Sequence, residues 1–170
     1  ALNEETGKYV TQIQLENGRL YEAVTDGHGK TESFEPKPWI ERDSQNRVTR
    51  VVDAGGREYK FEYEGNTTNL SRVQNAEGGD FHKVDGKWLN FKNGKKQYDG
   101  ELRVDQTTGE YSFTDTKTRH TTHRQLDGST LVVDENTQKP VSMTPRGGPT
   151  FSYTWNGEVI QKVSRSDGGT

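Results

Sequence analysis

Apolar residues alternate with charged or polar residues along several short segments of this chain. Tyr59, Phe61 and Tyr63 are separated by single charged residues, and the aromatic residues of segment 151–155 are separated by Ser and Thr. Segment 110–114 repeats the pattern around two more aromatic residues. Because successive side chains of a strand point to opposite faces, each segment predicts a β-strand with one apolar and one solvated face. Sheets of such strands are typically antiparallel.

Asn-Gly and Asp-Gly pairs divide the predicted strands. These pairs tolerate the positive φ angles that a tight hairpin turn requires, so each predicts a turn between neighbouring antiparallel strands. Consecutive strands are then expected to lie side by side as a meander. The pairs are Asn17-Gly18, Asp26-Gly27, Asp85-Gly86, Asn93-Gly94, Asp99-Gly100, Asp127-Gly128, Asn156-Gly157 and Asp167-Gly168.

Prolines mark two further features of the predicted sheet. Proline cannot donate to a ladder of hydrogen bonds, so Pro36 and Pro38 predict an edge strand or connector, and Pro140, Pro145 and Pro149 predict a second one. The fold class predicted from these patterns is all-β with essentially no helix. It is an antiparallel meander of β-hairpin repeats that forms an extended, twisted sheet or an open sandwich or solenoid.

The composition favours strands and argues against several kinds of protein. Thr and Val, whose branched side chains suit strands, number 20 and 13, whereas hydrophobic residues make up only 26% of the chain. Lys and Arg number 23 against 26 Asp and Glu, so no basic excess points to nucleic acid as a partner. Cysteine is absent, which excludes disulfides and thiolate metal sites. No apolar run approaches the roughly 18 residues of a membrane helix and no leader segment opens the chain, so we expect a soluble protein without membrane insertion.

The sequence also contains an internal repeat. The copy around Phe61 has a weaker match 27 residues upstream, in which Phe34 occupies the position of Phe61. We predict one β-repeat domain over 1–170, with copies at 16–35, 43–78 and 135–168 and a diverged hairpin insertion at 80–134. At a constant offset of 92, the matched pairs are Tyr59 and Phe151, Phe61 and Tyr153, Tyr63 and Trp155, and Gly65 and Gly157.

The middle copy carries a recognisable order of motifs. Segment 46–51 is a turn followed by a Val-rich strand, segment 53–57 (Asp-Ala-Gly-Gly-Arg) is an Asp-x-x-Gly-Arg turn, and segment 59–64 is a Tyr-x-Phe-x-Tyr-Glu strand. In this order the chain resembles the YD-repeat, or RHS-repeat, family, although Glu64 stands where that family usually has Asp and no Gly precedes Arg47. The resemblance implies β-hairpin repeats of a bacterial surface or secreted protein, with a spacer, shell or adhesion role and no catalysis in the repeats.

Histidines and carboxylates are the candidates for chemistry. His120 and His123 are three residues apart, which on a strand sends the two imidazoles to opposite faces and argues against a chelating pair. His28 and His82 have no neighbour at metal-site spacing. Acid–base catalysis could use a close pair of carboxylates, but the carboxylates are spread as an exposed sheet face requires. They are Asp99, Glu101, Asp105 and Glu110. We predict no catalytic residue, metal site or cofactor.

Aromatic residues are the candidates for binding. The aromatic strands could stack on sugar rings, yet in a chain with few Leu and Ile they are also the bulk of the core, and we expect the core role to dominate. Trp39 and Trp88 are the better binding candidates because polar residues or prolines flank them. Tyr63 and Trp155 complete the predicted ligand-binding set.

Three functions are consistent with these observations. The first is a non-enzymatic structural or interaction module of an exported bacterial protein, at the cell surface or outside the cell, with the periplasm as the alternative. Its partner is another protein or other repeats of the same parent protein. The second is a carbohydrate-binding module for cell-surface glycans. The third is an enzyme centred on carboxylates or on the His120 and His123 pair.

Overall fold

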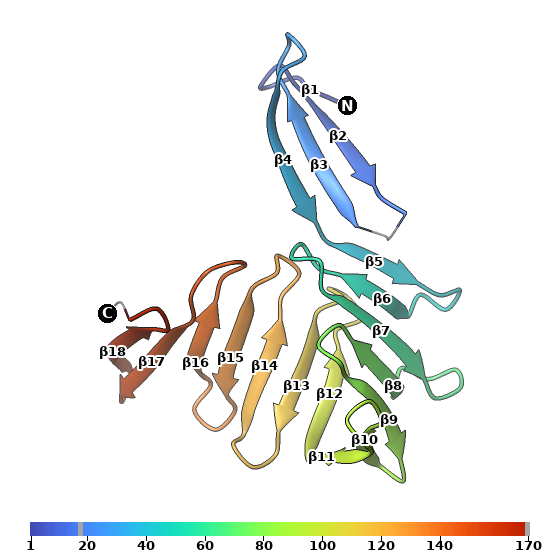
Figure 1. Cartoon of the computed structure of the whole chain (residues 1–170), viewed down its shortest axis with the longest axis vertical. Helices are drawn as coiled ribbons and strands as arrows, with labels where there is room; N and C mark the ends of the chain where they lie inside the picture. Colours follow the sequence, from blue (N-terminus) through green and yellow to red (C-terminus); the bar gives the residue numbers. More distant parts are fainter. Residues whose placement is uncertain (17–18, 169–170) are drawn as a thin grey trace.

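The computed structural model describes residues 1–16 and 19–168, and in this part of the chain it contains eighteen β-strands and no helix (Figure 1). The strands form three antiparallel sheets in which sequence neighbours pair, so the predicted all-β antiparallel meander is confirmed. The meander divides into three sheets, which decides between the alternatives of one extended sheet, a sandwich and a solenoid. The described residues therefore include no helical segment that could span a membrane.

The three sheets follow one another along the chain. The N-terminal sheet contains β1 (Leu2–Asn3), β2 (Lys8–Gln14), β3 (Leu20–Thr25) and β4 (Thr31–Lys37). The middle sheet contains β5 (Trp39–Arg42), β6 (Val48–Val52), β7 (Glu58–Tyr63), β8 (Leu70–Asn75), β9 (Asp80–Val84), β10 (Lys87–Asn90) and β11 (Lys96–Tyr98). The C-terminal sheet contains β12 (Gly100–Val104), β13 (Tyr111–Asp115), β14 (His120–Arg124), β15 (Thr130–Asp134), β16 (Lys139–Thr144), β17 (Phe151–Asn156) and β18 (Val159–Arg165).

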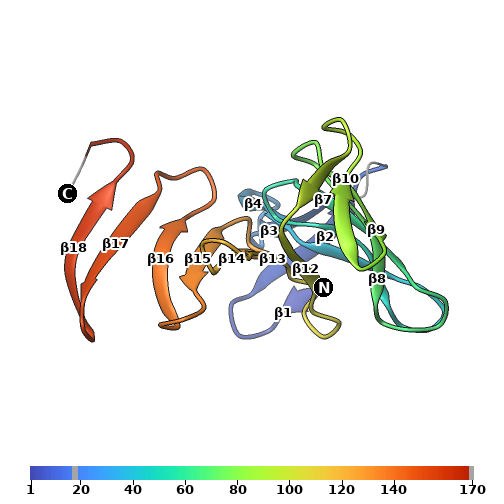
Figure 2. The same ribbon diagram turned by 90° about the horizontal axis from the view of Figure 1, so that it is seen from below.

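The core lies between the middle sheet and the first two strands of the C-terminal sheet. Seen from below, β14 to β18 extend away from this contact as an open sheet (Figure 2). The rings of Tyr59 and Phe61 pack on Tyr111, with ring centroids 5.0 and 5.8 Å apart. The buried cluster is Val48, Val51, Tyr59, Phe61, Leu70, Val73 and Trp88 from the middle sheet, and Leu102 and Tyr111 from the C-terminal sheet.

Two kinds of Asp or Asn turn connect the strands. In the five-residue kind, the first side chain accepts a hydrogen bond from the backbone N–H of the fifth residue, and the fourth residue has positive φ. These turns begin at Asp26, Asp43, Asp53 and Asn75. In the six-residue kind, the first side chain accepts from the third and fourth N–H groups and the fifth residue has positive φ. These turns begin at Asn3, Asp105, Asp115 and Asp134.

The predicted Gly turns have different outcomes. Asp85-Gly86 forms the two-residue turn between β9 and β10, with φ of 50° and 75°. Asp99-Gly100 was wrong as a hairpin turn, because Gly100 begins β12 and the pair links two sheets. Asp167-Gly168 follows the last strand, and Asn17-Gly18 lies outside the described residues. The pairs beginning at residues 26, 93, 127 and 156 lie at connections between paired strands, as expected.

Proline positions follow the prediction in part. Pro36 lies in β4, an edge strand, and Pro38 connects β4 to β5. Pro145 and Pro149 flank the turn between β16 and β17. Pro140, however, lies in the inner strand β16, where a register irregularity at the pairing with β15 accommodates it.

Turns of the middle sheet hold the C-terminal sheet in place. Arg57 donates from Nε to Asp53 at 2.6 Å, and its other nitrogens donate to the Gly128 carbonyl and the Thr130 hydroxyl at 3.0 Å. The backbone N–H of Ala54 donates to the Leu126 carbonyl at 2.8 Å. We call this contact the Arg57 junction; it joins the turn between β6 and β7 to the turn between β14 and β15.

A second contact between the two sheets lies at the opposite end of β6 and β7. Arg42 donates to the backbone carbonyls of Gln106 and Thr107. The Gln106 side chain accepts from the Val48 N–H and donates to the Tyr63 hydroxyl, at 3.0 and 2.8 Å. Together with the Arg57 junction, this contact fixes both ends of the inter-sheet core.

The two aromatic repeat copies share a local structure but differ in burial. In each copy the aromatic strand, β7 or β17, is the middle strand of three, and the register shifts between Glu62 and Tyr63 and at the matched position between Thr154 and Trp155. The strands of the first copy enter the core. The second copy keeps the aromatic face of β17 half-buried. Among the matched aromatic residues, Tyr59 and Phe61 are therefore in the core and Tyr63 packs against it, whereas those of β17 lie outside it.

Candidate functional site

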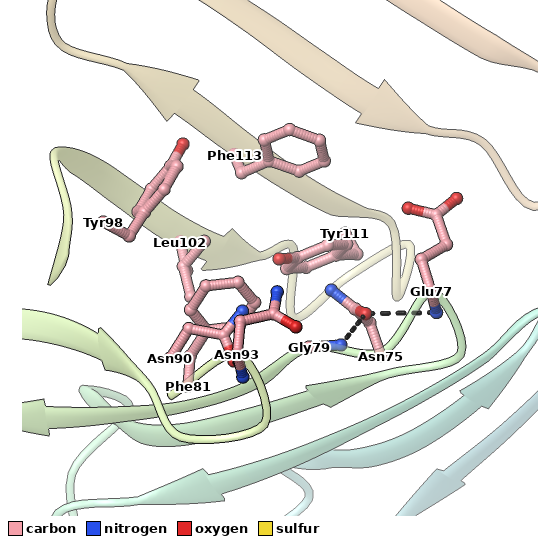
Figure 3. Close-up of a pocket in the computed structure, with 10 residues that line it drawn as sticks. All are labelled: Asn75, Glu77, Gly79, Phe81, Asn90, Asn93, Tyr98, Leu102, Tyr111 and Phe113. Atoms are coloured by element: carbon pink, nitrogen blue, oxygen red, sulfur yellow. Dashed lines mark hydrogen bonds between the residues drawn. The ribbon is translucent and has the colours of Figure 1, made fainter. Parts of the chain in front are cut away.

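A cavity of about 210 Å³ lies where the middle sheet meets the C-terminal sheet. Figure 3 shows Tyr98 and Phe113 on one side of it and Phe81, Asn90 and Asn93 on the other. The lining residues span 75–113 and come from both sheets, so the cavity exists only once the sheets have packed together. Asn75, Glu77, Gly79, Leu102 and Tyr111 complete the lining.

Aromatic rings form most of the apolar wall of the cavity. Phe81 meets Tyr98 edge to face, with ring centroids 5.8 Å apart, and Phe113 lies at the same distance from Tyr111. The Tyr98 hydroxyl donates to the Thr114 carbonyl at 2.8 Å. Burial raises the pKa of Tyr98 to about 12 and also raises the pKa of Tyr111, so both phenols are neutral at physiological pH.

Asparagine side chains supply the polar part of the lining. The Asn90 carbonyl oxygen accepts from the backbone N–H groups of Lys92 and Asn93, and the Asn75 oxygen accepts from those of Glu77 and Gly79. The backbone turns therefore orient both amides. Because their oxygens are engaged, these side chains present N–H donors rather than acceptors, and Asn75 already makes a side-chain hydrogen bond with Tyr111.

The charge at the rim of the cavity is compensated. Glu77 accepts from Arg124 at 2.8 Å, and the Arg124 guanidinium lies 5.5 Å from the centroid of the Phe113 ring. Glu77 is the one carboxylate among the ten lining residues, and the lining holds no His or Ser. The arrangement suits binding of a neutral group, and it lacks the two carboxylates that glycoside hydrolysis uses.

Trp88, predicted as a ligand-binding residue, lies in the core. Only 2% of its surface is exposed, so its ring has no free face on which a ligand could stack, and this prediction is corrected. Its segment, Lys-Trp-Leu-Asn, forms β10. The packing of the two sheets determines which face of β10 is buried. Tyr63 has a structural role as well, because its hydroxyl donates to the Val48 carbonyl and Arg47 covers its ring at 4.8 Å.

Neither Trp39 nor Trp155 lines the cavity, and the two residues lie in different sheets. Trp39 is in the edge strand β5 and donates from Nε1 to Glu41 at 3.2 Å. Trp155 is in β17, donates to the Pro140 carbonyl at 2.8 Å and has the Lys139 ammonium 5.4 Å from its ring centroid. Both are half-buried, and their predicted roles in ligand binding stay predictions.

The histidines do not converge. β14 pairs with both neighbours without a bulge, so His120 and His123 lie on opposite faces, as expected, and they approach Asp134 and Glu110 respectively. Among the residues that the structure describes, no group of three or more His, Asp or Glu side chains is arranged to hold a metal ion. His28 lies in the turn between β3 and β4, and His82 lies 3.2 Å from Asp80.

The predicted carboxylate cluster also separates. Asp105 accepts from the N–H groups of Thr107 and Thr108, which lower its pKa, and thus it stabilises a turn. Asp99 lies in the link between sheets. Glu101 and Glu110 lie in or beside different strands, with Glu110 next to His123.

A second candidate surface is the apolar face of the N-terminal sheet. Strand pairing sets Ile13 opposite Tyr21 and Ala23 opposite Phe34, which places these side chains on one face, together with Tyr9 four residues before Ile13. The rings of Tyr21 and Phe34 stack at 4.8 Å and are nearly parallel. Phe34 is 55% exposed, and Leu2, Tyr9 and Ile13 are also exposed. We call this surface the open aromatic face; it consists of Leu2, Tyr9, Ile13, Tyr21, Ala23 and Phe34.

Comparison with known proteins leaves the family open. No protein-family model matches this chain, and a search of the curated proteins finds no match either. The resemblance to YD repeats stays a prediction. The cavity residues Phe81, Tyr98, Asn75 and Asn90 were not predicted from the sequence; the one local signal was the Asn93-Gly94 pair, which places Asn93 in a turn.

Proposed function

We propose that this chain is a non-catalytic structural and interaction module that assembles with further sheets of its own kind. Following the YD-repeat resemblance, it serves as a spacer, shell or adhesion element of an exported bacterial protein, outside the cell or at its surface. The observation that supports this proposal is the open aromatic face. A face of stacked and exposed aromatic rings is typical of interaction surfaces.

The internal repeat suggests what covers that face. Phe34 matches Phe61 at the offset of 27 residues, and Phe61 is 3% exposed because the next sheet supplies Tyr111 against it. The stacked rings of Tyr21 and Phe34 have no such sheet packed on them among the described residues. We therefore assign a second copy of this chain, contributing an aromatic sheet face, as the partner of the open aromatic face.

Sedimentation equilibrium of the whole chain tests this proposal. The wild-type chain associates as its concentration rises, and Phe34→Ser shifts the equilibrium strongly toward monomer because it removes the most exposed ring of the face. Gln12→Ser is the matched control: Gln12 is exposed on the opposite face of the same sheet, next to Ile13. A wild-type chain that stays monomeric at all concentrations, or equal association of both variants, contradicts the proposal.

A further inference from the structure

We propose that the cavity between the middle and C-terminal sheets binds one neutral hexopyranose residue of a glycan. This inference does not depend on assembly through the open aromatic face, which lies on another sheet. It also differs from stacking on Trp39 or Trp155, because it places the ring against Phe81 and Phe113 and beside the asparagines (Figure 3).

The size of the cavity selects a single ring. Its volume of about 210 Å³ is below the roughly 300–1,000 Å³ of sites for drug-sized ligands, so it cannot enclose a peptide or several sugar residues. Glu77 and Asn93 belong to turns and are exposed, whereas Leu102 and Tyr111 are buried. The turn residues therefore form the mouth, and a ring can enter there while the rest of a glycan remains outside.

The chemistry of the lining selects a ring with both apolar and hydroxyl groups. Phe81 and Phe113 are half-buried and present aromatic surface to C–H groups of a pyranose. The amide nitrogens of Asn90 and Asn93 provide donors to hydroxyl oxygens, and the turn that engages the Asn90 oxygen holds its amide in one orientation. Ligands of this mixed kind are fixed by a few convergent polar groups in an otherwise apolar pocket.

The charge of the site selects a neutral sugar. Arg124 neutralises Glu77 at 2.8 Å, and the other lining residues are uncharged at neutral pH. A uronate would meet the Glu77 carboxylate without a free cation among the lining residues, whereas a neutral hexose requires no compensating charge.

The test is an NMR titration of the full chain with the methyl glycosides of glucose, galactose, mannose and N-acetylglucosamine. We expect saturable shifts of the side-chain amide signals of Asn75, Asn90 and Asn93 with at least one glycoside. Sorbitol, an open-chain polyol, causes none. Asn93→Ala, an exposed change that leaves the core intact, weakens binding about five- to tenfold, as the loss of one hydrogen bond predicts.

Matched variants separate binding from folding. Phe113→Leu also weakens binding, whereas Asn136→Ala, an exposed turn asparagine between β15 and β16, and Phe34→Leu on the open aromatic face leave it unchanged. The proposal is overturned if none of the four glycosides gives saturable shifts, if the shifts centre on Tyr153 and Trp155, or if Asn93→Ala binds as tightly as the wild type.

Discussion

The Arg57 junction allows a quantitative test of how the two large sheets are held together. Arg57→Met keeps the length and much of the apolar stem of the side chain but removes its charge and donors. The Asp53 side chain, which Arg57 contacts at 2.6 Å, is 1% exposed, so the variant leaves a carboxylate buried without its partner. The bonds to Gly128 and Thr130 across the junction are lost as well.

The size of the effect follows from this burial. Removing one partner of a buried ion pair costs about 3–5 kcal/mol. The Arg57 side chain is 21% exposed, so water reaches part of the pair, and we expect the low end, about 3 kcal/mol. In a domain of this size that corresponds to a fall of about 6–12 °C in Tm.

Urea unfolding followed by the fluorescence of Trp88 measures this cost, in a background where Trp39 and Trp155 are replaced by Phe. Arg165→Met is the control, because the Arg165 and Asp167 side chains are about half exposed and such pairs contribute about 0–1 kcal/mol. Adding Asp53→Asn to Arg57→Met recovers part of the loss by removing the unpaired charge. A cost for Arg57→Met below about 1 kcal/mol, or equal to that of the control, would show that the Arg57 junction does not act as a buried ion pair.

Three further predictions concern the fold. Gly100→Ala lowers the free energy of unfolding by more than about 1 kcal/mol, because an added Cβ would lie 1.9 Å from the Thr114 carbonyl oxygen. Thermal melts measure this loss. Gly27→Ala is the control and leaves Tm unchanged, because Gly27 has open space around it and no positive φ. Stability falls as the pH rises above 10 and through the folded pKa of Tyr98, about 12, because the folded state keeps a proton that the unfolded state loses; alkaline titration of Tm measures this. Stability also falls as the pH drops below about 4, because Arg72 lowers the pKa of Asp80 in the folded state, and Asp80→Asn flattens this acid limb of the Tm curve.

Local chemistry made the strands and many turns predictable. Apolar and charged residues alternate around Tyr59 and Phe61 because successive side chains of a strand point to opposite faces. The positive φ angles of Asp85-Gly86 follow from the residue types. The opposite faces of His120 and His123 followed from spacing, because β14 pairs regularly. The six-residue turns were missed, since an Asp or Asn with a Thr three residues later also occurs in ordinary loops.

Packing between sheets was not predictable by the same means. Trp88 is in the core and Trp155 is half-buried, because β10 belongs to the sheet that packs against Leu102 and Tyr111, whereas β17 lies beyond the first two strands of the C-terminal sheet, which make this contact. The cavity joins Asn75 to Phe113 across two sheets, and no periodicity within one strand reports such a contact. Asp99-Gly100 has the sequence of a hairpin turn, but its role as a link depends on where the next sheet packs.

Hydrogen exchange measured at low and high protein concentration reports whether the open aromatic face is an assembly surface. If a second copy covers this face, raising the concentration slows exchange in β2 to β4 and in the segment of the second copy that covers them, and Phe34→Ser abolishes the change. Exchange that is independent of concentration, or slowing confined to the edge strand β18 with Phe34→Ser behaving like wild type, contradicts this role for the face.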